Sequence, residues 1–369
     1  MSTHENPSSA SPPSPALPAA APSIHRRRTR YAGKNPQRFQ DKYKEHNPER
    51  YAADVAKVIA SGKTPAGTHR PILVAEILTV LALQPGESAV DCTLGFGGHA
   101  QELFARLAPG GRLIGLDVDP VEHAKTTARL RADGWSEEAF TAVRSNFAGL
   151  PKVLQQLGLD GVDAILADLG VSSMQLDDPV RGFTFKTDCP LDLRLNPTRA
   201  PSAADWLASV TVKALTTALT DNSDEPHAVL LARAITTQQS QTPFTRTLQL
   251  ARAIRTILHE HNPRHDNATD DACIRRVFQA IRIEVNDEFG ALDMFLRHLP
   301  SCLKAGGRVA ILTFHSGEDR RVKQAFREGV RSGIYASTND DLVRAGPEER
   351  RANPRSVSAK LRWAVRASG

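Results

Sequence analysis

Hydrophobic and polar positions along residues 88–119 predict a strand, a tight turn, a helix and a second strand. Residues 88–91 form a short run that ends in an acid, which is typical of a buried strand. A glycine-rich turn at 95–99 leads into a helical pattern, and a second apolar run at 112–116 ends in Asp117. This order matches the first βαβ unit of a nucleotide-binding sheet, so it predicts an α/β fold.

The turn and the acids around it indicate what binds there. Glycines let the backbone turn tightly and approach a ligand, and the helix that follows presents unpaired N–H groups to it. Asp117 lies about 20 residues further on, where such folds hydrogen-bond a ribose diol. Glycines alone also fit ordinary strand-to-helix packing. However, Asp91 precedes the turn in the pattern DxTxGxGG, which is closer to S-adenosylmethionine sites than to GxGxxG, so we expect an adenosyl nucleoside ligand.

Alternating strands and helices continue on both sides of this unit. The sequence predicts a helix opened by residues 69–71, a helix over 120–130, a strand at 140–143, a helix around 150–157 and a strand at 162–166. In open α/β sheets ligands lie at the carboxyl ends of the strands. We therefore expect the polar clusters at 95–99, 117–119, 146–147, 168–175 and 313–320 to converge there.

From residue 175 to about 273 only helical patterns are found. They cover 206–219, 228–237 and 245–257, with polar breaks at 221–226 and 261–271. A long helical stretch between βα units predicts an inserted subdomain. The alternation then resumes with helices over 274–283 and 286–303, a turn at 304–307 and a strand at 308–313.

Composition limits the class of protein. The chain has 369 residues, 40% of them hydrophobic, which suits one large domain with an insertion or two domains. No apolar run approaches the ~18 residues of a membrane span, so we expect no membrane association. The four cysteines lack CxxC spacing, which argues against a metal site or disulfide framework and favours a reducing, cytoplasmic compartment. Buried packing is the expected role of Cys92 and Cys302.

Charge is unevenly distributed along the chain. The net charge is +6, yet residues 24–50 alone hold nine Lys/Arg against three acids, and residues 320–369 hold twelve against five. An acidic body with two basic ends suits a polyanion such as RNA, although solvated tails are the simpler alternative for the N-terminal run. Residues 1–23 are mostly Pro, Ser and Ala, which predicts disorder.

Eight ordered motifs resemble one family. They are HRPIL at 69–73, DCTLGFGGH at 91–99, DLGVSSMQLDD at 168–178, RGFTF at 181–185, PLDLRLNP at 190–197, FQAIRIEVNDE at 278–288, TFHSGEDRRVK at 313–323 and NPRSVSAKLR at 353–362. Together they resemble the MraW/RsmH family, S-adenosylmethionine-dependent methyltransferases that act on cytidine N4 in small-subunit ribosomal RNA. Phe96, Met174 and Gly317 depart from the usual pattern of the family. Residues 1–66 lie outside the resemblance.

The resemblance implies a class I (Rossmann-like) methyltransferase sheet with an inserted helical subdomain. Composition and charge predict a disordered basic N-terminal extension in front of it. We therefore expect an extension (1–66), a first methyltransferase part (67–176), the inserted subdomain (177–273) and a second methyltransferase part with a basic C-terminal tail (274–369). The implied cofactor is S-adenosylmethionine, which leaves as S-adenosylhomocysteine, and no metal is implied. The implied partner is small-subunit ribosomal RNA, in an assembled or nearly assembled subunit.

The cofactor contacts carried over from the family are Gly97, Gly98, His99, Asp117, Phe147, Asp168 and Gln175. Asp168 is also the expected acceptor for the proton that N4 sheds, since an acceptor there would localise the amine lone pair. Holding the cofactor, or capping the next turn, are its competing roles. His99 is expected to bind cofactor only. His315 either orients the nucleotide or is structural.

Other side chains have two open interpretations. Ser172 and Ser173 either cap a turn or contact the base. Asp192 and Arg194 are expected to pair with each other or with the cleft rim. Phe183 and Phe185 either stack on an extruded cytosine or pack a hinge under the inserted subdomain, and packing is favoured. A nicotinamide-dependent oxidoreductase and a ribosome-assembly protein without catalysis are the alternative classes; the glycine spacing and the intact cleft motifs argue against them.

Overall fold

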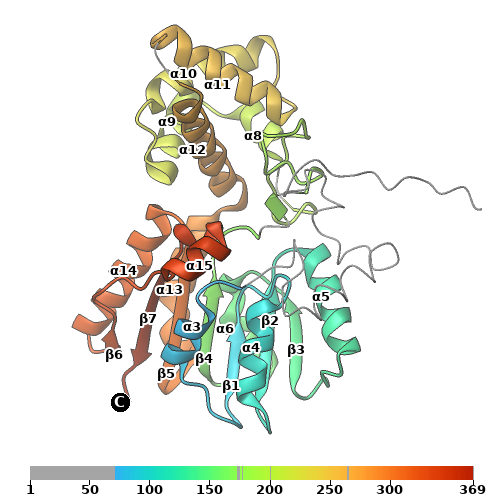
Figure 1. Cartoon of the computed structure of the whole chain (residues 1–369), viewed down its shortest axis with the longest axis vertical. Helices are drawn as coiled ribbons and strands as arrows, with labels where there is room; N and C mark the ends of the chain where they lie inside the picture. Colours follow the sequence, from blue (N-terminus) through green and yellow to red (C-terminus); the bar gives the residue numbers. More distant parts are fainter. Residues whose placement is uncertain (1–70, 173–174, 177, 200, 264–265, 369) are drawn as a thin grey trace, which may run out of the picture.

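The computed structural model describes residues 71–172, 175–176, 178–199, 201–263 and 266–368. Its centre is a seven-stranded sheet in the order β3-β2-β1-β4-β5-β7-β6, in which the first five are parallel and β7 is antiparallel to both neighbours (Figure 1). The strands are β1 Ser88–Asp91, β2 Arg112–Asp117, β3 Phe140–Arg144, β4 Val162–Asp168, β5 Leu303–Thr313, β6 Tyr335–Thr338 and β7 Lys360–Arg366.

Side-chain alternation along the strands builds two apolar layers, one on each face of the sheet. In β4, Ala164 and Leu166 face the layer under α3 (Val74–Leu81) and α4 (Gly98–Leu107). Ile165 and Ala167 face the opposite layer, under α6 (Leu150–Gln156), α13 (Glu288–Cys302) and α14 (Ser316–Arg331). A strand that is buried on both faces reads as a continuous apolar run, which is why these strands were visible in the sequence. The remaining elements at the sheet are α5 Pro120–Ala132, η2 Phe147–Gly149, α15 Pro347–Ala352 and η3 Pro354–Val357.

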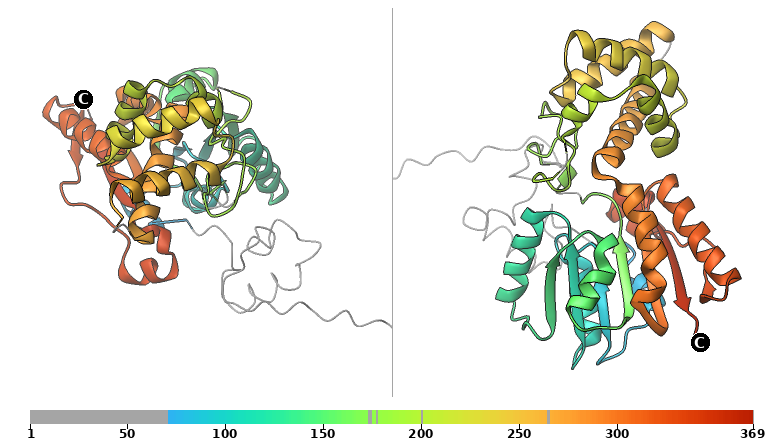
Figure 2. Two further views of the ribbon diagram at one scale, coloured as in Figure 1. Left: turned by 90° about the horizontal axis from the view of Figure 1, so that it is seen from above. Right: turned by 180° about the vertical axis from the view of Figure 1, so that it is seen from behind.

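Five helices form a unit with its own core beyond the carboxyl ends of the parallel strands (Figures 1 and 2). They are α8 Ala203–Ser209, α9 Val212–Ser223, α10 Ala228–Gln241, α11 Thr247–His261 and α12 Asn267–Asn286. We call α8–α12 the helical unit. α12 runs without a break across residue 273, where the sequence analysis places the end of the inserted subdomain, and it leads directly to α13 at the sheet.

The strands at 88–91, 112–116, 140–143 and 162–166 and the helices between them are confirmed. The helix predicted over 206–219 is wrong in one respect, because it is two helices. Ser202 caps α8 and Thr211 caps α9, and each accepts a hydrogen bond from a backbone N–H three residues ahead. The polar break at 261–271 is shorter than predicted, because Asp266 caps α12 and lets it start at Asn267.

Two further expectations near the C-terminus are corrected. The turn predicted at 304–307 belongs to β5, whose pairing with β4 shifts register there. Residues 320–368 are not a tail but supply most of α14, then α15 and the antiparallel strands, because their apolar positions fill the sheet edge. The predicted extension at 1–66 lies outside the described residues.

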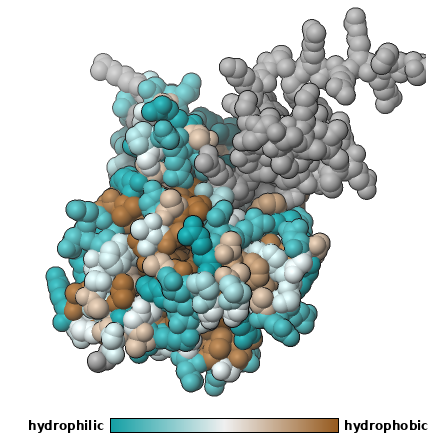
Figure 3. Space-filling view, turned by 60° about the horizontal axis from the view of Figure 1, so that its bottom comes forward, coloured by the Kyte–Doolittle hydropathy of each residue, from teal (hydrophilic) through white to brown (hydrophobic). Residues whose placement is uncertain are grey.

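On the face drawn in Figure 3, hydrophilic residues predominate, with smaller hydrophobic groups between them. The exposed large hydrophobic side chains of the described residues, among them Val121, Val229 and Met294, lie on separate elements, as is ordinary for protein surfaces. None of the helices in the described part of the chain is long and apolar enough to cross a membrane. All four cysteines are buried and unpaired, which confirms the packing role expected of Cys92 and Cys302.

Candidate active site

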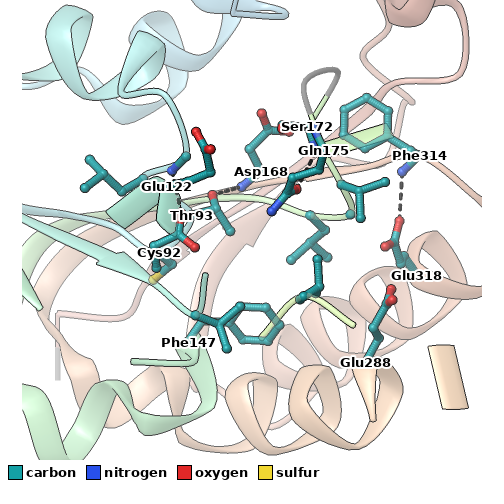
Figure 4. A pocket seen from close by; sticks show the side chains of 18 of the residues that line it. Cys92, Thr93, Glu122, Phe147, Asp168, Ser172, Gln175, Glu288, Phe314 and Glu318 are labelled. Carbon is teal, nitrogen blue, oxygen red and sulfur yellow. Dashed lines mark hydrogen bonds between the residues drawn. The ribbon is translucent and has the colours of Figure 1, made fainter. Parts of the chain in front are cut away.

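A cavity of about 360 Å³ opens at the carboxyl ends of the parallel strands, facing the helical unit (Figure 4). The loops after β1, β2, β3, β4 and β5 all contribute to its walls, so the predicted convergence of polar clusters is confirmed. The structure brings all seven residues of the carried-over set to this cavity: Gly97, Gly98, His99, Asp117, Phe147, Asp168 and Gln175. From the other side, the end of α12 and the start of α13 and α14 close it.

The glycine turn is shaped by backbone conformation and by crowding. Gly97 has φ +76°, a left-handed value that favours glycine, and it precedes the first residue of α4. A Cβ on Gly98 would lie 3.2 Å from the ring of Pro71, so the turn packs closely against the segment before α3. Phe96, the residue that departs from the family pattern, lies under the guanidinium of Arg129, 4.3 Å from its ring centre. Arg129 also donates a hydrogen bond to the Phe96 carbonyl.

Asp117 closes β2 and orders the loops on either side of it. Its Oδ2 accepts from the Gly95 N–H at 2.7 Å, and its Oδ1 accepts from the Asp119 N–H at 2.8 Å. Burial raises the pKa of Asp117 to about 6, against the lowering effect of these two bonds. Each carboxylate oxygen has a second lone pair, so Asp117 retains acceptor capacity toward the cavity.

Gln175 is bonded on both ends of its amide. Its Oε1 accepts from the Ser172 N–H at 2.9 Å, while its Nε2 donates to Asp119 Oδ2 at 2.8 Å. Ser172 Oγ in turn accepts from the Gln175 N–H at 3.2 Å, which is the turn-capping role favoured for this serine. Asp119 Oδ2 also accepts from Arg181 Nη1 at 2.7 Å, so the loop after β4 is tied to the loop after β2.

Asp168 ends β4 and projects into the cavity (Figure 4). Its N–H donates to Thr93 Oγ1 at 2.7 Å, and the Thr93 N–H donates to Asp91 Oδ1 at 3.1 Å, so the ends of β1 and β4 are joined. Burial and, to a smaller extent, the charge of Glu318 together raise the pKa of Asp168 to about 7. Among the described residues, Asp168 Oδ1 and Asp91 Oδ2 have no hydrogen-bond partner.

His99 lies in the first turn of α4 and is 7% exposed. Its Nε2 is 2.9 Å from the Ile72 carbonyl oxygen and its Nδ1 is 3.5 Å from Asp168 Oδ2. Burial lowers its pKa, although the Ile72 carbonyl and the charge of Asp91 act in the opposite direction. The histidine thus contacts both a backbone anchor and the predicted proton acceptor.

The wall opposite the glycine turn holds two largely buried pairs of side chains, whose pairing the sequence did not predict. Arg282 donates from Nε and Nη2 to the two oxygens of Glu288, at 2.8 and 2.9 Å. His315 Nε2 lies 3.2 Å from Glu318 Oε1. Burial opposes ionisation of Glu318, but His315, the Phe314 N–H and Arg282 together hold its pKa below the usual value. Both pairs lie inside quoted motifs, at 278–288 and 313–323, so the motifs were the available signal.

Several side chains prove to be structural. Phe183 is buried in the core of the helical unit, and Phe185 packs against it with its ring 5.6 Å from that of Phe278, so the packing interpretation is confirmed. Asp192 and Arg194 pair with each other, which is also confirmed: Nε and Nη2 donate to the carboxylate at 2.8 and 2.7 Å.

The doubly wound order 3-2-1-4-5, the glycine turn before α4 and the acid at the end of β2 define a class I methyltransferase fold. A family model described as the MraW methylase family matches residues 66–367, and the chain belongs to this family. It is therefore an S-adenosylmethionine-dependent methyltransferase.

Relatives agree with this assignment. The chain is 46% identical over 345 residues to "Ribosomal RNA small subunit methyltransferase H 1" of Lachnoclostridium phytofermentans, covering 93% of this chain and 94% of the relative. It is 44% identical to a protein of the same name from Agathobacter rectalis, covering 93% and 98%. To "Ribosomal RNA small subunit methyltransferase H" of Chromobacterium violaceum it is 40% identical, covering 83% and 97%.

The fraction of the chain that aligns with these relatives corrects the expectation for residues 1–66. A match over 93% of the chain is longer than residues 66–367 supply, so similarity to the first two relatives reaches into the segment before residue 66. The expectation that all of residues 1–66 lies outside the resemblance is therefore wrong.

The residues present fit S-adenosylmethionine. The cavity is of the size that takes a small ligand. Its charged lining beside the glycine turn is acidic, with Asp117, Glu122 and Asp168, which suits the hydroxyls and positive charges of this cofactor. The buried Asp168 Oδ1, which has no hydrogen-bond partner in the part of the chain that the structure describes, is a further acceptor there. No group of three or more His, Cys, Asp or Glu side chains among the described residues could hold a metal ion.

Proposed function

We propose that this chain transfers the methyl group of S-adenosylmethionine to the exocyclic N4 of a cytidine in small-subunit ribosomal RNA. Membership of the MraW methylase family supports the reaction, and the names of the relatives support the substrate class. The single observation that carries the chemistry is Asp168, a largely buried carboxyl at the end of β4 that lines the cofactor cavity and whose pKa is raised to about 7.

The cofactor is held, in this proposal, by the seven residues carried over from the family. The turn at Gly97 and Gly98 provides a close backbone surface and the N–H groups at the start of α4. Asp117 accepts from the ribose, since it keeps lone pairs free toward the cavity. Phe147, supported edge-on by Phe295 at 5.3 Å, supplies an apolar wall. Gln175, His99 and Asp168 complete the set.

When bound, the cofactor supplies an activated methyl group: the N4–carbon bond forms as the sulfur–carbon bond breaks, and N4 must shed one proton. Asp168 takes that proton. Its pKa of about 7 is near the working pH of most cytoplasmic reactions, where a general base is most effective. The Thr93 hydroxyl fixes the backbone of Asp168, so the carboxyl is presented to the cavity without a conformational search.

The substrate proposed in finer detail is an assembled or nearly assembled small subunit in the cytoplasm. The basic run at 24–50 supports contact with a polyanion, because nine Lys/Arg stand there against three acids. The division of the chain at residues 66, 176 and 273 stays part of this proposal, with residues 177–273 as the inserted subdomain that covers the substrate side of the cavity.

The experiment is transfer of tritiated methyl groups from S-adenosylmethionine to small subunits isolated from cells that lack this enzyme, followed by nucleoside analysis. We expect label in N4-methylcytidine, a loss of at least about 10²-fold in rate for Asp168→Asn, and a normal rate for Asp163→Asn. The latter makes the same substitution at the far end of β4. Label on carbon-5, or on DNA only, contradicts the proposal.

A further inference from the structure

The two ring nitrogens of His99 lie against the Ile72 carbonyl and the Asp168 carboxylate. The carbonyl oxygen of Ile72, 2.9 Å from Nε2, can only accept a hydrogen bond, so Nε2 carries a hydrogen. In a neutral imidazole Nδ1 is then an acceptor, and it faces Asp168 Oδ2 at 3.5 Å. Two lone pairs facing each other in a buried site repel. One proton between them removes the repulsion, and such contacts are often long before substrate binds.

The groups that face this pair are acidic. Asp91 comes from β1, Glu102 from α4 itself and Glu349 from α15, and all three act on His99. Glu318 of α14 acts on Asp168. Burial opposes charge on both partners, lowering the pKa of His99 and raising that of Asp168. The surroundings therefore favour one proton between His99 Nδ1 and Asp168 Oδ2 near neutral pH. The acidic neighbours also stabilise the positive charge that one more proton would bring to the pair.

We propose that His99 is a positioning residue for methyl transfer, which shares one proton with Asp168 and so keeps the other Asp168 oxygen ready to accept the N4 proton. This rests on the proposed function, in which Asp168 is that acceptor, and it differs from the cofactor contact that the family resemblance implies for His99.

The proton movements balance. The N4 proton binds to Asp168 Oδ1, which has no partner among the described residues. The proton already shared on Oδ2 moves to His99 Nδ1. The resulting imidazolium donates to the Ile72 carbonyl from Nε2, and the charge of Asp91 stabilises it. The pair gains one proton, which passes to solvent once the product has left.

The test compares His99→Gln with His123→Gln. A glutamine at 99 can still donate to the Ile72 carbonyl but cannot take up a proton. His123 lies on α5 and does not line the cavity. We expect His99→Gln to bind S-adenosylhomocysteine within about threefold of the wild type by calorimetry, because the glutamine keeps a polar side chain at the cofactor contact assigned to His99 and a donor for the Ile72 carbonyl. Its single-turnover rate should fall about 10²-fold, and the rise of rate with pH should move to higher pH, because the uncharged amide no longer assists ionisation of Asp168. His123→Gln should match the wild type.

A spectroscopic measurement does not depend on activity. The ¹⁵N shifts of His99 in the full chain with S-adenosylhomocysteine should titrate together with Asp168, and Asp168→Asn should change the titration of Nδ1 while Nε2 keeps its hydrogen. The inference is overturned if these shifts ignore Asp168→Asn, or if His99→Gln keeps the wild-type rate and pH profile, or if it loses only cofactor affinity. A wild type that methylates no cytidine refutes the proposed function instead, and the shift measurement then still decides whether the proton is shared.

Discussion

Removal of Arg181 should destabilise the fold more than removal of an arginine from an exposed ion pair of equal length, because Arg181 joins the loop after β2 to the segment at 194–195. Arg181 donates from Nη1 to Asp119 Oδ2 at 2.7 Å, and from Nη2 to the carbonyl oxygens of Arg194 and Leu195 at 3.2 and 2.7 Å. The side chains of Arg181 and Asp119 are 10% and 0% exposed. Solvent therefore cannot replace the lost partner.

The magnitude follows from what Asp119 keeps. Breaking a buried pair by removing one partner costs about 3–5 kcal/mol, because a buried charge is left uncompensated. In Arg181→Met the carboxylate still accepts from Gln175 Nε2 and from the N–H groups of Val121 and Glu122. We therefore expect the lower end, about 3 kcal/mol of unfolding free energy. Affinity for S-adenosylmethionine should also fall, because Leu195 lines the cavity.

The assay is urea unfolding followed by tryptophan fluorescence, with cofactor binding measured by calorimetry. The matched control is Arg255→Met, which removes an ion pair to Asp271 of the same 2.7 Å length whose side chains are 35% and 40% exposed. Exposed pairs contribute about 0–1 kcal/mol. Equal losses in the two variants, or a loss below about 1 kcal/mol for Arg181→Met, would refute the reasoning that burial decides the effect.

Three further predictions concern other parts of the chain. Gly97→Ala should lower the melting temperature more than Gly110→Ala: both have φ near +80°, but only at Gly97 would a Cβ come within 3.1 Å of a neighbouring methyl group, a difference of about 1 kcal/mol. Burial opposes ionisation of Asp163, yet hydrogen bonds from Lys304 and a backbone N–H hold its pKa below the usual value. The ionised carboxylate therefore stabilises the fold above pH ~4, and this stabilisation is lost as the pH falls. Asp163→Asn should therefore cost about 0.5–1 kcal/mol at pH 7 and nothing near pH 2, measured by urea midpoints; an equal cost at both would contradict this. Deletion of residues 1–50 should leave cofactor affinity intact but weaken RNA binding and flatten its salt dependence, and an unchanged slope would assign that segment to something other than RNA.

Local pattern was sufficient for most of the sheet. The strands at 88–91, 112–116 and 162–166 were predictable because each is a short apolar run that follows a polar or glycine residue and ends at or near an aspartate. The glycine turn was predictable because only glycine adopts its backbone angles without strain. The segment 206–219 was predicted as one helix because its apolar positions continue through the break. The break is set by Thr211, which caps the N-terminus of α9 as Ser202 caps that of α8, and capping hydrogen bonds cannot be inferred from apolar spacing.

The sequence by itself therefore determined the five parallel strands, the placement of acids at the ends of several of them and, through its motifs, the family and cofactor, but not the antiparallel strands β6 and β7. Only the tertiary structure decided which charges meet. His99 and Asp168 are 69 residues apart in the sequence and Arg181 and Asp119 are 62 apart, and neither contact follows from periodicity or spacing. Protonation states depend on burial and on such contacts, so the pKa of Asp168 near 7, on which the proposed chemistry depends, exists only once the strands and helices have come together.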